Sequence, residues 1–269
     1  MKGKTFLILA IIGAQWVSVL CSHGEPRSPG IYNGTVIFDR WDGCILYQGI
    51  YVMYISEKVK EQLRPYAGQA VRLDAKEVIQ PVNPGDGRIE KFTYLGNAPE
   101  IQNSKMKEVQ LSAQLVSKYG SKPILRINIC NNGKSSVKIQ SSELAPTLLT
   151  GKDSEWESSF NPSDAASYAL VTRRDLGTTG SNFSNWSGEG GGAKKTYSWT
   201  IGEENALPQS FVLEPGKSKI VDICFKLLGG EYEFLCGYTD DGSSRKCLTS
   251  NLVAFDVNEK GDVVKNGRK

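Results

Sequence analysis

The sequence contains a single histidine, His23, at the end of an apolar N-terminal segment. Serine and cysteine nucleophiles are usually activated by an imidazole base, and imidazole is also the commonest protein ligand of zinc and copper. The rest of the chain has no such group. We therefore expect no histidine-dependent catalytic site, no metal site and no cofactor, which indicates a protein that is not an enzyme.

Two other features are missing. The chain has no strong excess of charge of one sign, because 32 basic residues stand against 29 acidic ones. Proteins that bind nucleic acid normally carry a concentrated basic surface. After the N-terminal segment, no apolar run reaches the roughly 20 residues that a membrane-spanning helix needs. We therefore expect no nucleic-acid partner and no second membrane segment.

The N-terminal segment itself has the pattern of a secretory signal. Two lysines provide a short basic start, an apolar stretch follows, and the small residues Ser22 and Gly24 stand at positions −3 and −1 of a cleavage site. We expect a signal peptide over residues 1–24 and an extracytoplasmic mature protein, either secreted or periplasmic. Two alternatives stay open, an uncleaved membrane anchor and a lipidated Cys21.

Residues 31–98 have the pattern of a small β unit with one helix. Strands are expected where β-branched and aromatic residues concentrate, as in 44–55, and where apolar and charged residues alternate, as in 69–80. Between these segments, apolar residues recur at helical spacing from Val59 to Tyr66. Strands, one helix and further strands in this order resemble an OB-like small barrel.

A polar stretch, residues 99–107, is the predicted linker to a second unit. From 108 to 258 the pattern changes to longer strands without a helix, such as 124–130 and 221–225, in which apolar residues alternate with polar ones. Residues 259–269 are expected to form a polar tail. The predicted fold class is mostly β, with a small barrel followed by a two-sheet sandwich.

Three segments of the second unit carry a resemblance to a known architecture. They are the turn Leu213–Gly216, the strand start Gly230–Phe234 and the last strand Ser250–Val257, which follow the order L-x-P-G, G-x-Y and a hydrophobic final strand. In these segments the chain resembles an immunoglobulin-like β-sandwich of the secreted bacterial kind. The resemblance implies a fold and no active site. The whole chain is also similar to uncharacterised secreted bacterial proteins, which implies no function.

Five of the six cysteines follow the predicted cleavage site. In an oxidising compartment disulfides are the expected state. The alternation of side chains along strands puts Cys236 and Cys247 on one side of a terminal hairpin, and puts Cys130 and Cys224 on the outward faces of neighbouring strands. We predict these two disulfides. Cys44 is then left over, and we expect it to be a small buried residue of a strand.

Residues 151–200 form an excursion that is rich in serine, glycine and threonine but also contains aromatic residues. A long connection of this kind is usually functional or disordered, and disordered segments are poor in aromatic residues. Trp156, Trp186 and Trp199 are therefore candidates for stacking against a ligand. The alternative is that these side chains pack back over the open end of the sandwich.

The sequence as a whole favours a non-enzymatic binding or structural module with a protein or glycan partner. Two alternatives remain. A pair of carboxylates can hydrolyse polysaccharides, and acidic residues gather at Asp39 and Asp42 and in segments 153–157 and 240–241. An exposed sandwich edge can also bind a partner by strand addition, as a periplasmic inhibitor or assembly factor would.

Overall fold

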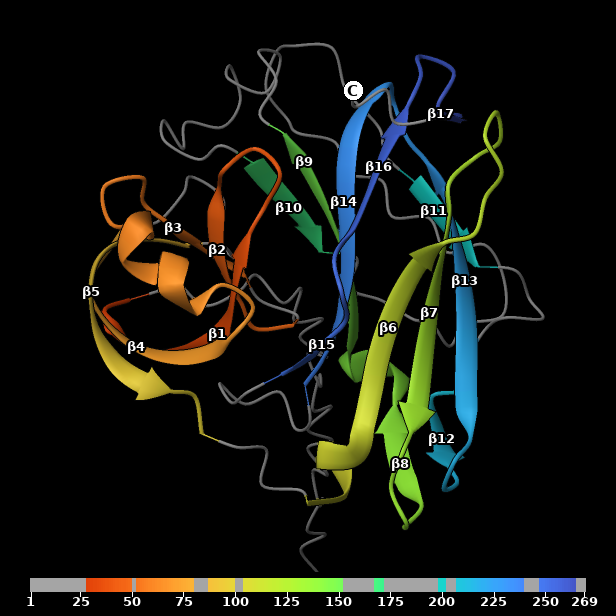
Figure 1. Cartoon of the computed structure of the whole chain (residues 1–269), viewed down its shortest axis with the longest axis horizontal. Coiled ribbons are helices and arrows are strands. Elements are labelled where there is room, and N and C mark those ends of the chain that lie inside the picture. The colour runs from red at the N-terminus through yellow and green to blue at the C-terminus, as the bar shows by residue number, and fades with distance from the viewer. Residues whose placement is uncertain are drawn as a thin grey trace, which may run out of the picture.

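The computed structural model describes residues 28–49, 52–79, 87–99, 104–151, 167–171, 198–201, 207–239 and 247–264. They form strands and three short 3₁₀ helices, which confirms a mostly β protein. Figure 1 shows three layers, in which a barrel lies against a first sheet and a second sheet lies on the side of the first sheet away from the barrel. The predicted signal peptide, residues 1–24, lies outside the described residues. No helix of the described part is long and apolar enough to cross a membrane.

Five strands close into the barrel in the order β1-β2-β3-β5-β4. Their bounds are β1 (Gly30–Phe38), β2 (Cys44–Tyr47), β3 (Val52–Ile55), β4 (Ala70–Ile79) and β5 (Gly87–Asn97). Most neighbours run antiparallel, but β3 and β5 pair in parallel. The interior is filled by aliphatic side chains such as Val36, Leu46 and Leu73, all of which are fully buried.

The predicted helix of the small unit is present as the 3₁₀ helix η1 (Lys60–Tyr66). Leu63 points into the barrel core, and Val59 and Tyr66 pack beside it, so the apolar face expected from the spacing is confirmed. The helix is short and contains Pro65 in its last turn, where the missing N–H prevents further growth. Gly68, with a φ of +77°, then turns the chain into β4.

The remaining elements form two sheets and a ribbon. The first sheet has the order β10-β9-β14-β16-β17, with β15 paired to β14. Its strands are β9 (Leu144–Gly151), β10 (Ser167–Val171), β14 (Gly230–Tyr238), β15 (Leu248–Thr249), β16 (Val253–Val257) and β17 (Val263–Val264).

The second sheet has the order β11-β13-β7-β6. Its strands are β6 (Val109–Leu115), β7 (Ile124–Asn131), β11 (Ser198–Ile201) and β13 (Ser218–Lys226). The ribbon pairs β8 (Val137–Gln140) with β12 (Ser210–Leu213), and the other helices are η2 (Ser104–Glu108) and η3 (Ser141–Glu143).

The two sheets share one apolar core. Along β7 the inward residues Leu125, Ile127 and Ile129 are fully buried while their neighbours are partly exposed, as the alternation predicts. From the opposite sheet Phe234 reaches Phe225 edge-on, with ring centroids 5.9 Å apart. The core extends past the predicted boundaries of the second unit. Met106 of η2 is buried in it although it belongs to the predicted linker, and β17 lies in the predicted polar tail.

The edge of the second sheet at β6 is covered by a side chain. The amide of Asn251 accepts a hydrogen bond from Ala113 N and donates one to Ala113 O, both at 2.9 Å. The amide therefore takes the place of a neighbouring strand at this point. An edge whose backbone groups are already paired is a poor template for another chain. This observation weighs against strand addition at β6.

The first sheet differs from the second because its central strands are buried on both faces. In β14, Phe234 and Cys236 lie in the core between the sheets, whereas Leu235 packs toward the barrel. All residues of β9 from Leu144 to Thr150 are buried. A strand that is covered on both sides loses the alternation that marks a half-exposed strand. The first sheet is therefore the middle layer of the molecule.

Candidate functional site

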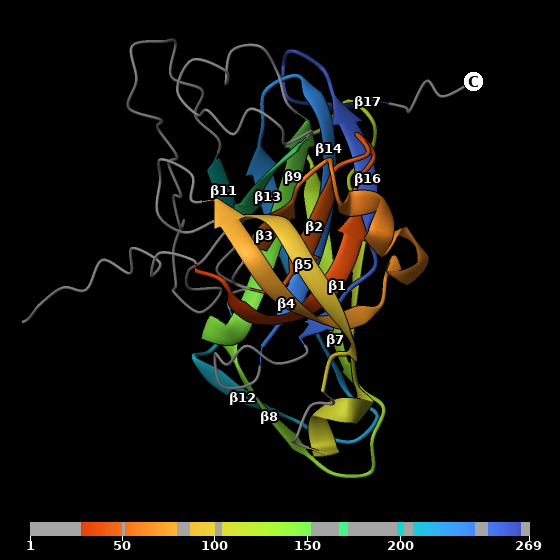
Figure 2. The ribbon, with the colours of Figure 1, turned by 90° about the vertical axis from the view of Figure 1, so that its left-hand side faces the viewer.

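The barrel contacts the first sheet through the outward face of β2 and β3. Figure 2, which views the molecule from the barrel side, shows the barrel lying over the sandwich. Ile45, Tyr47 and Val52 of the barrel form one buried apolar cluster with Leu149 and Leu235 of the sheet. We call this the barrel–sheet contact. Burying each such side chain contributes about 1.5–3 kcal/mol.

Tyr47 adds hydrogen bonds to this contact. Its hydroxyl donates to the carbonyl oxygen of Ala145 at 2.8 Å and lies 3.0 Å from the hydroxyl of Thr147. The side chain is fully buried, and burial raises the pKa of the phenol well above its usual range. The phenol is therefore neutral at physiological pH and can act as a donor to β9.

Two glycines allow the barrel and the sheet to approach closely. A Cβ at Gly237 of β14 would lie 2.8 Å from both the Cα of Gly49 and the ring of Tyr47. Gly49 has a φ of +77° and faces the hydroxyl of Thr239. Glycine is required here for close packing at Gly237 and for backbone conformation at Gly49. Such a fit indicates a permanent contact between two parts of one folded unit.

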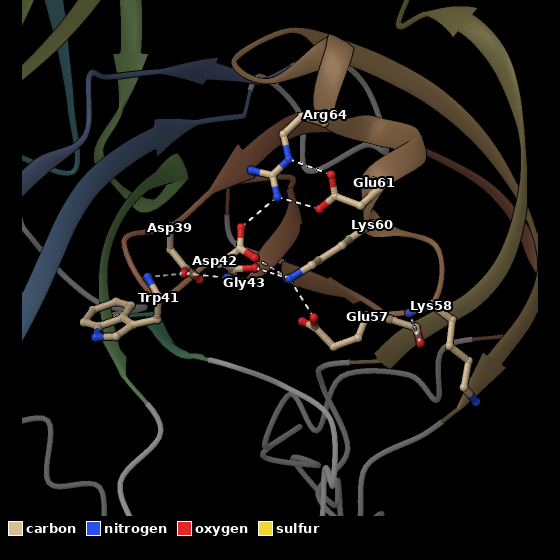
Figure 3. A network of polar contacts seen from close by, with 10 residues as sticks. Asp39, Trp41, Asp42, Gly43, Glu57, Lys58, Lys60, Glu61 and Arg64 are labelled. Atoms are coloured by element: carbon tan, nitrogen blue, oxygen red, sulfur yellow. Dashed lines mark hydrogen bonds and ion pairs between the residues drawn. The ribbon is translucent and has the colours of Figure 1, made fainter.

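The loop between β1 and β2, residues 39–43, reaches both the sandwich and η1. The carboxylate of Asp39 accepts hydrogen bonds from the backbone N–H groups of Trp41, at 3.0 Å, and Gly43, at 2.8 Å (Figure 3). Asp42 has a φ of +65°, a conformation that aspartate tolerates better than most residues. The tight turn sends Arg40 toward the sandwich and Asp42 toward η1.

Arg40 is buried among acidic residues of the first sheet. Its guanidinium donates to the carboxylate of Asp256 at 2.6 Å, and its Nε lies 3.7 Å from Glu231. Its backbone N–H donates to Glu233 at 3.0 Å. Only 3% of the Arg40 side chain is exposed. We call these four residues the inner cluster, in which the guanidinium pairs with Asp256 and Glu231 and the backbone N–H of Arg40 binds Glu233.

Asp42 belongs to a second group of charges, which Figure 3 shows beside η1. Its carboxylate accepts hydrogen bonds from Arg64 at 2.7 Å and from Lys60 at 2.9 Å. Hydrogen bonds from Arg64 and then from Lys60 lower the pKa of Asp42 to about 2. Arg64 also pairs with Glu61 and lies over the ring of Phe38, 4.1 Å from its centroid. We call Asp42, Lys60, Glu61, Arg64 and Glu57 the outer cluster.

The lysine of the outer cluster is its only buried member. The ammonium of Lys60 donates to the backbone oxygen of Asp42 at 2.7 Å and pairs with Glu57 at 2.6 Å. Burial alone would lower its pKa, but the bonds to Glu57 and Asp42 outweigh that effect and leave the pKa raised. Lys60 is therefore charged and tied to the turn. The outer cluster joins η1 to the β1–β2 loop.

The carboxylates singled out by the sequence thus have structural partners. Asp39 holds the turn through two backbone N–H groups, and Asp42 ties the turn to η1. The acidic segments 153–157 and 240–241 lie outside the described residues. Within the described part, no group of three His, Cys, Asp or Glu residues has an arrangement that could hold a metal ion.

The structure corrects the predicted disulfide between Cys130 and Cys224, because no disulfide joins the two residues. They do lie on neighbouring strands, β7 and β13. The register, however, pairs Cys130 with Ser218 and Cys224 with Ile124, at opposite ends of the ladder. Six residues of strand separate them by about 20 Å, whereas a disulfide needs Cα atoms within about 7 Å.

The predicted disulfide between Cys236 and Cys247 is also absent, since both are free. Ser250 takes the place opposite Cys236 and exchanges two hydrogen bonds with its backbone, at 2.8 and 2.9 Å. Cys236 points into the sandwich core, whereas Cys247 lies in the barrel–sheet contact, on the other face of the sheet. The alternation of side chains does not continue from β16 back to Cys247, because β15 and β16 are separate strands, so the two cysteines end on opposite faces.

The three buried thiols are unreactive in the folded protein. Burial raises the pKa of Cys44 to about 12, and it also raises the pKa of Cys236 and Cys247. The thiolate is the reactive form of cysteine, so these three groups are poor nucleophiles in the folded protein. Cys44 lies in the barrel core, as expected from the sequence.

Only one of the three candidate stacking tryptophans lies in the described part. Trp199 belongs to β11, where the register places it opposite Phe225 of β13. Trp156 and Trp186 lie outside the described residues. The tryptophan that the structure brings into a defined contact is Trp41, which lies against Gly151 at the end of β9. A Cβ at Gly151 would stand 2.5 Å from the indole Nε1 of Trp41.

Sequence reasoning missed the inner cluster and the barrel–sheet contact. A signal for the contact was available, because Cys44–Tyr47 and Leu144–Leu149 are mostly apolar and show no alternation. Such runs are typical of strands that are covered on both faces. No comparable signal marks Arg40, because its three acidic neighbours come from β14 and β16, about 190 to 216 residues later in the chain.

Comparison with known proteins gives no relative. No family model, no curated protein and no solved structure matches this chain.

Proposed function

We propose that this chain is a non-enzymatic, extracytoplasmic binding or structural module, in which an OB-like barrel and an immunoglobulin-like sandwich form one rigid body. The N-terminal signal pattern supports the location. The partner that we propose is a protein or a glycan.

The topology supports the two fold assignments. The barrel order β1-β2-β3-β5-β4, with a helix between β3 and β4, agrees with a five-stranded OB-like barrel. Two antiparallel sheets around a shared core agree with an immunoglobulin-like sandwich.

The barrel–sheet contact bears on which partners the barrel can bind. OB-like barrels bind oligonucleotides and oligosaccharides on the face of β2 and β3. In this chain that face carries Ile45, Tyr47 and Val52, which are buried against the sandwich. The proposal therefore assigns the β2–β3 face to internal packing and places the partner elsewhere on the molecule.

A single observation carries the non-enzymatic part of the proposal: Asp39, Asp42 and three of the thiols have structural roles. Asp39 and Asp42 accept hydrogen bonds within the barrel, and three thiols are buried with raised pKa values. A catalytic group has to meet its substrate with a pKa suited to proton transfer or attack. The three thiols lack access to a substrate, and the lowered pKa of Asp42 makes it a poor proton donor or acceptor near neutral pH.

The proposed partner surface is the excursion of residues 151–200, with its tryptophans. The test is a glycan array and a pull-down with the secreted protein and its Trp186→Ala and Trp156→Ala variants. Binding that is lost in either variant while the far-UV circular dichroism is unchanged supports the proposal. Hydrolysis of a polysaccharide panel that is lost in Asp42→Asn would contradict it and favour the hydrolase alternative.

A further inference from the structure

The barrel touches one strand of the sandwich along its whole length. The residues of β9 that face the barrel are Ala145, Thr147, Leu149 and Gly151, which alternate with core residues such as Leu148. Tyr47 bonds to Ala145 and Thr147, and Leu149 lies in the barrel–sheet contact. Trp41 lies against Gly151. The barrel therefore supports β9 from its first residues to its last.

The next strand, β10, depends on β9. In the order of the first sheet β10 is the outermost strand, and among the described strands it pairs with β9 alone. The ladder runs from Thr147, opposite Val171, to Gly151, opposite Ser167. An outer strand held on one side follows the shape and the stability of its neighbour. Contacts that fix the position of β9 therefore also fix the position of β10.

Trp41 stands at a particular point of this arrangement. Gly151, which it covers, is the last residue of β9 and pairs with Ser167, the first residue of β10. The loop that carries Trp41 is fixed on both sides, by Arg40 in the inner cluster and by Asp42 in the outer cluster. An indole on a fixed loop can hold a strand end in place because it brings a large buried area and few rotatable bonds.

We infer that the barrel acts as an internal clamp that positions the β9–β10 hairpin, with Trp41 as the positioning residue at the end of that hairpin where β9 ends and β10 begins. The inference deepens the proposed function, because it names the element that fixes the strands from which the proposed binding excursion starts. It makes the barrel a support for binding by the sandwich rather than a second binding domain.

Hydrogen exchange of the full-length mature protein, read by mass spectrometry, tests the inference without any ligand. In Trp41→Ala, amides of 147–151 and 167–171 are expected to exchange at least tenfold faster than in the wild type, while β7 and β13 keep their protection. Trp41→Phe is expected to restore most of the protection. The control is Tyr66→Ala, which removes a half-buried ring that stacks on Tyr94, at 4.3 Å between centroids.

Two results would overturn the inference. One is unchanged exchange in β9 and β10 of Trp41→Ala, and the other is an equal rise in every strand or in the Tyr66→Ala control. If Trp41→Ala does not fold, Gly151→Ala displaces the indole from the other side and is read in the same way. Because no partner is used, a failed glycan or pull-down screen leaves this result intact, and a failed exchange experiment leaves the proposed partner open.

Discussion

Arg40 and Asp42 are two residues apart in one loop, yet their environments are opposite. Arg40 has 3% of its side chain exposed and pairs through its guanidinium with two carboxylates of the sandwich, whereas the Asp42 side chain is 62% exposed and pairs with two cations of η1. Removing one partner of a buried ion pair leaves an uncompensated charge, whereas water replaces a partner at the surface. The burial of an ion pair therefore decides its contribution to stability more than the distance between the two charged groups does.

The largest effect is expected from Arg40→Met, which keeps much of the buried volume and removes the charge. The mostly buried carboxylate of Asp256 then loses its cation, and the free energy of unfolding should fall by about 3–5 kcal/mol at pH 7. Urea unfolding followed by circular dichroism at pH 7 measures this effect.

The matched control for this prediction is Arg64→Met in the outer cluster. It removes an arginine that also bonds to two carboxylates, but in a position open to water. Its effect on stability at pH 7 should be small. An equal decrease in the free energy of unfolding in the two variants would show that the inner cluster contributes no more to stability than the outer cluster does.

A smaller effect is expected from Gly237→Ala in the barrel–sheet contact. The added methyl group would press against Gly49 and Tyr47, and overpacking of this kind typically costs about 1–3 kcal/mol. Thermal unfolding should show a lower midpoint and still a single transition. Gln62→Ala, on the exposed side of η1, is the control and should change little. A variant as stable as the wild type would mean that the contact is loose.

Asp42→Asn should have a smaller effect that depends on pH. The folded pKa of Asp42, about 2, lies below its ordinary value of 3.8, so the carboxylate contributes stability above about pH 4. That contribution is lost as the pH falls through 2. The difference between wild type and variant should therefore be constant at neutral pH and vanish in strong acid. Asparagine also accepts the positive φ of this position, so the change isolates the charge. A difference as large at pH 2 as at pH 7 would contradict the ion-pair assignment.

The smallest effect concerns labelling of thiols, which leaves stability unchanged. Cys130 and Cys224 are half-buried and should react with a maleimide in the native protein, whereas Cys44, Cys236 and Cys247 should react only after unfolding. Intact mass spectrometry should show no mass loss from disulfides. In Gly237→Ala, Cys247 should label before Cys236, because it lies in the loosened contact. Rapid labelling of all five thiols in the wild type would contradict the buried positions.

The elements that the sequence predicted correctly are those whose pattern is local. Alternation along β7 and β13 and the apolar face of η1 depend on spacing within one element, and each is confirmed. Continuous burial hides such a pattern, which is why β9 was not assigned although it lies in the middle of the molecule. The position of the barrel on the sandwich could not be predicted either, because it depends on residues that approach from distant parts of the chain.

The errors in the candidate site have the same cause. Both disulfides were inferred from which face a cysteine occupies, but a bond also requires the correct position along the ladder. For Cys130 and Cys224 the face was suitable and the register was not. For Cys236 and Cys247 a break between two strands reversed the face. Register is set by contacts between strands, and one strand does not encode it alone.

Two strands that are covered on both faces also limit how this architecture can have arisen. Many multidomain proteins exchange their parts freely, because each part keeps its own water-facing exterior. Here β9 and β14 have no such exterior, and only a glycine at position 237 leaves room for Gly49 and Tyr47 of the barrel. A gene fusion that joined the barrel or the sandwich alone to an unrelated domain would expose the apolar barrel–sheet contact to water. The barrel and the sandwich are therefore expected to be inherited together.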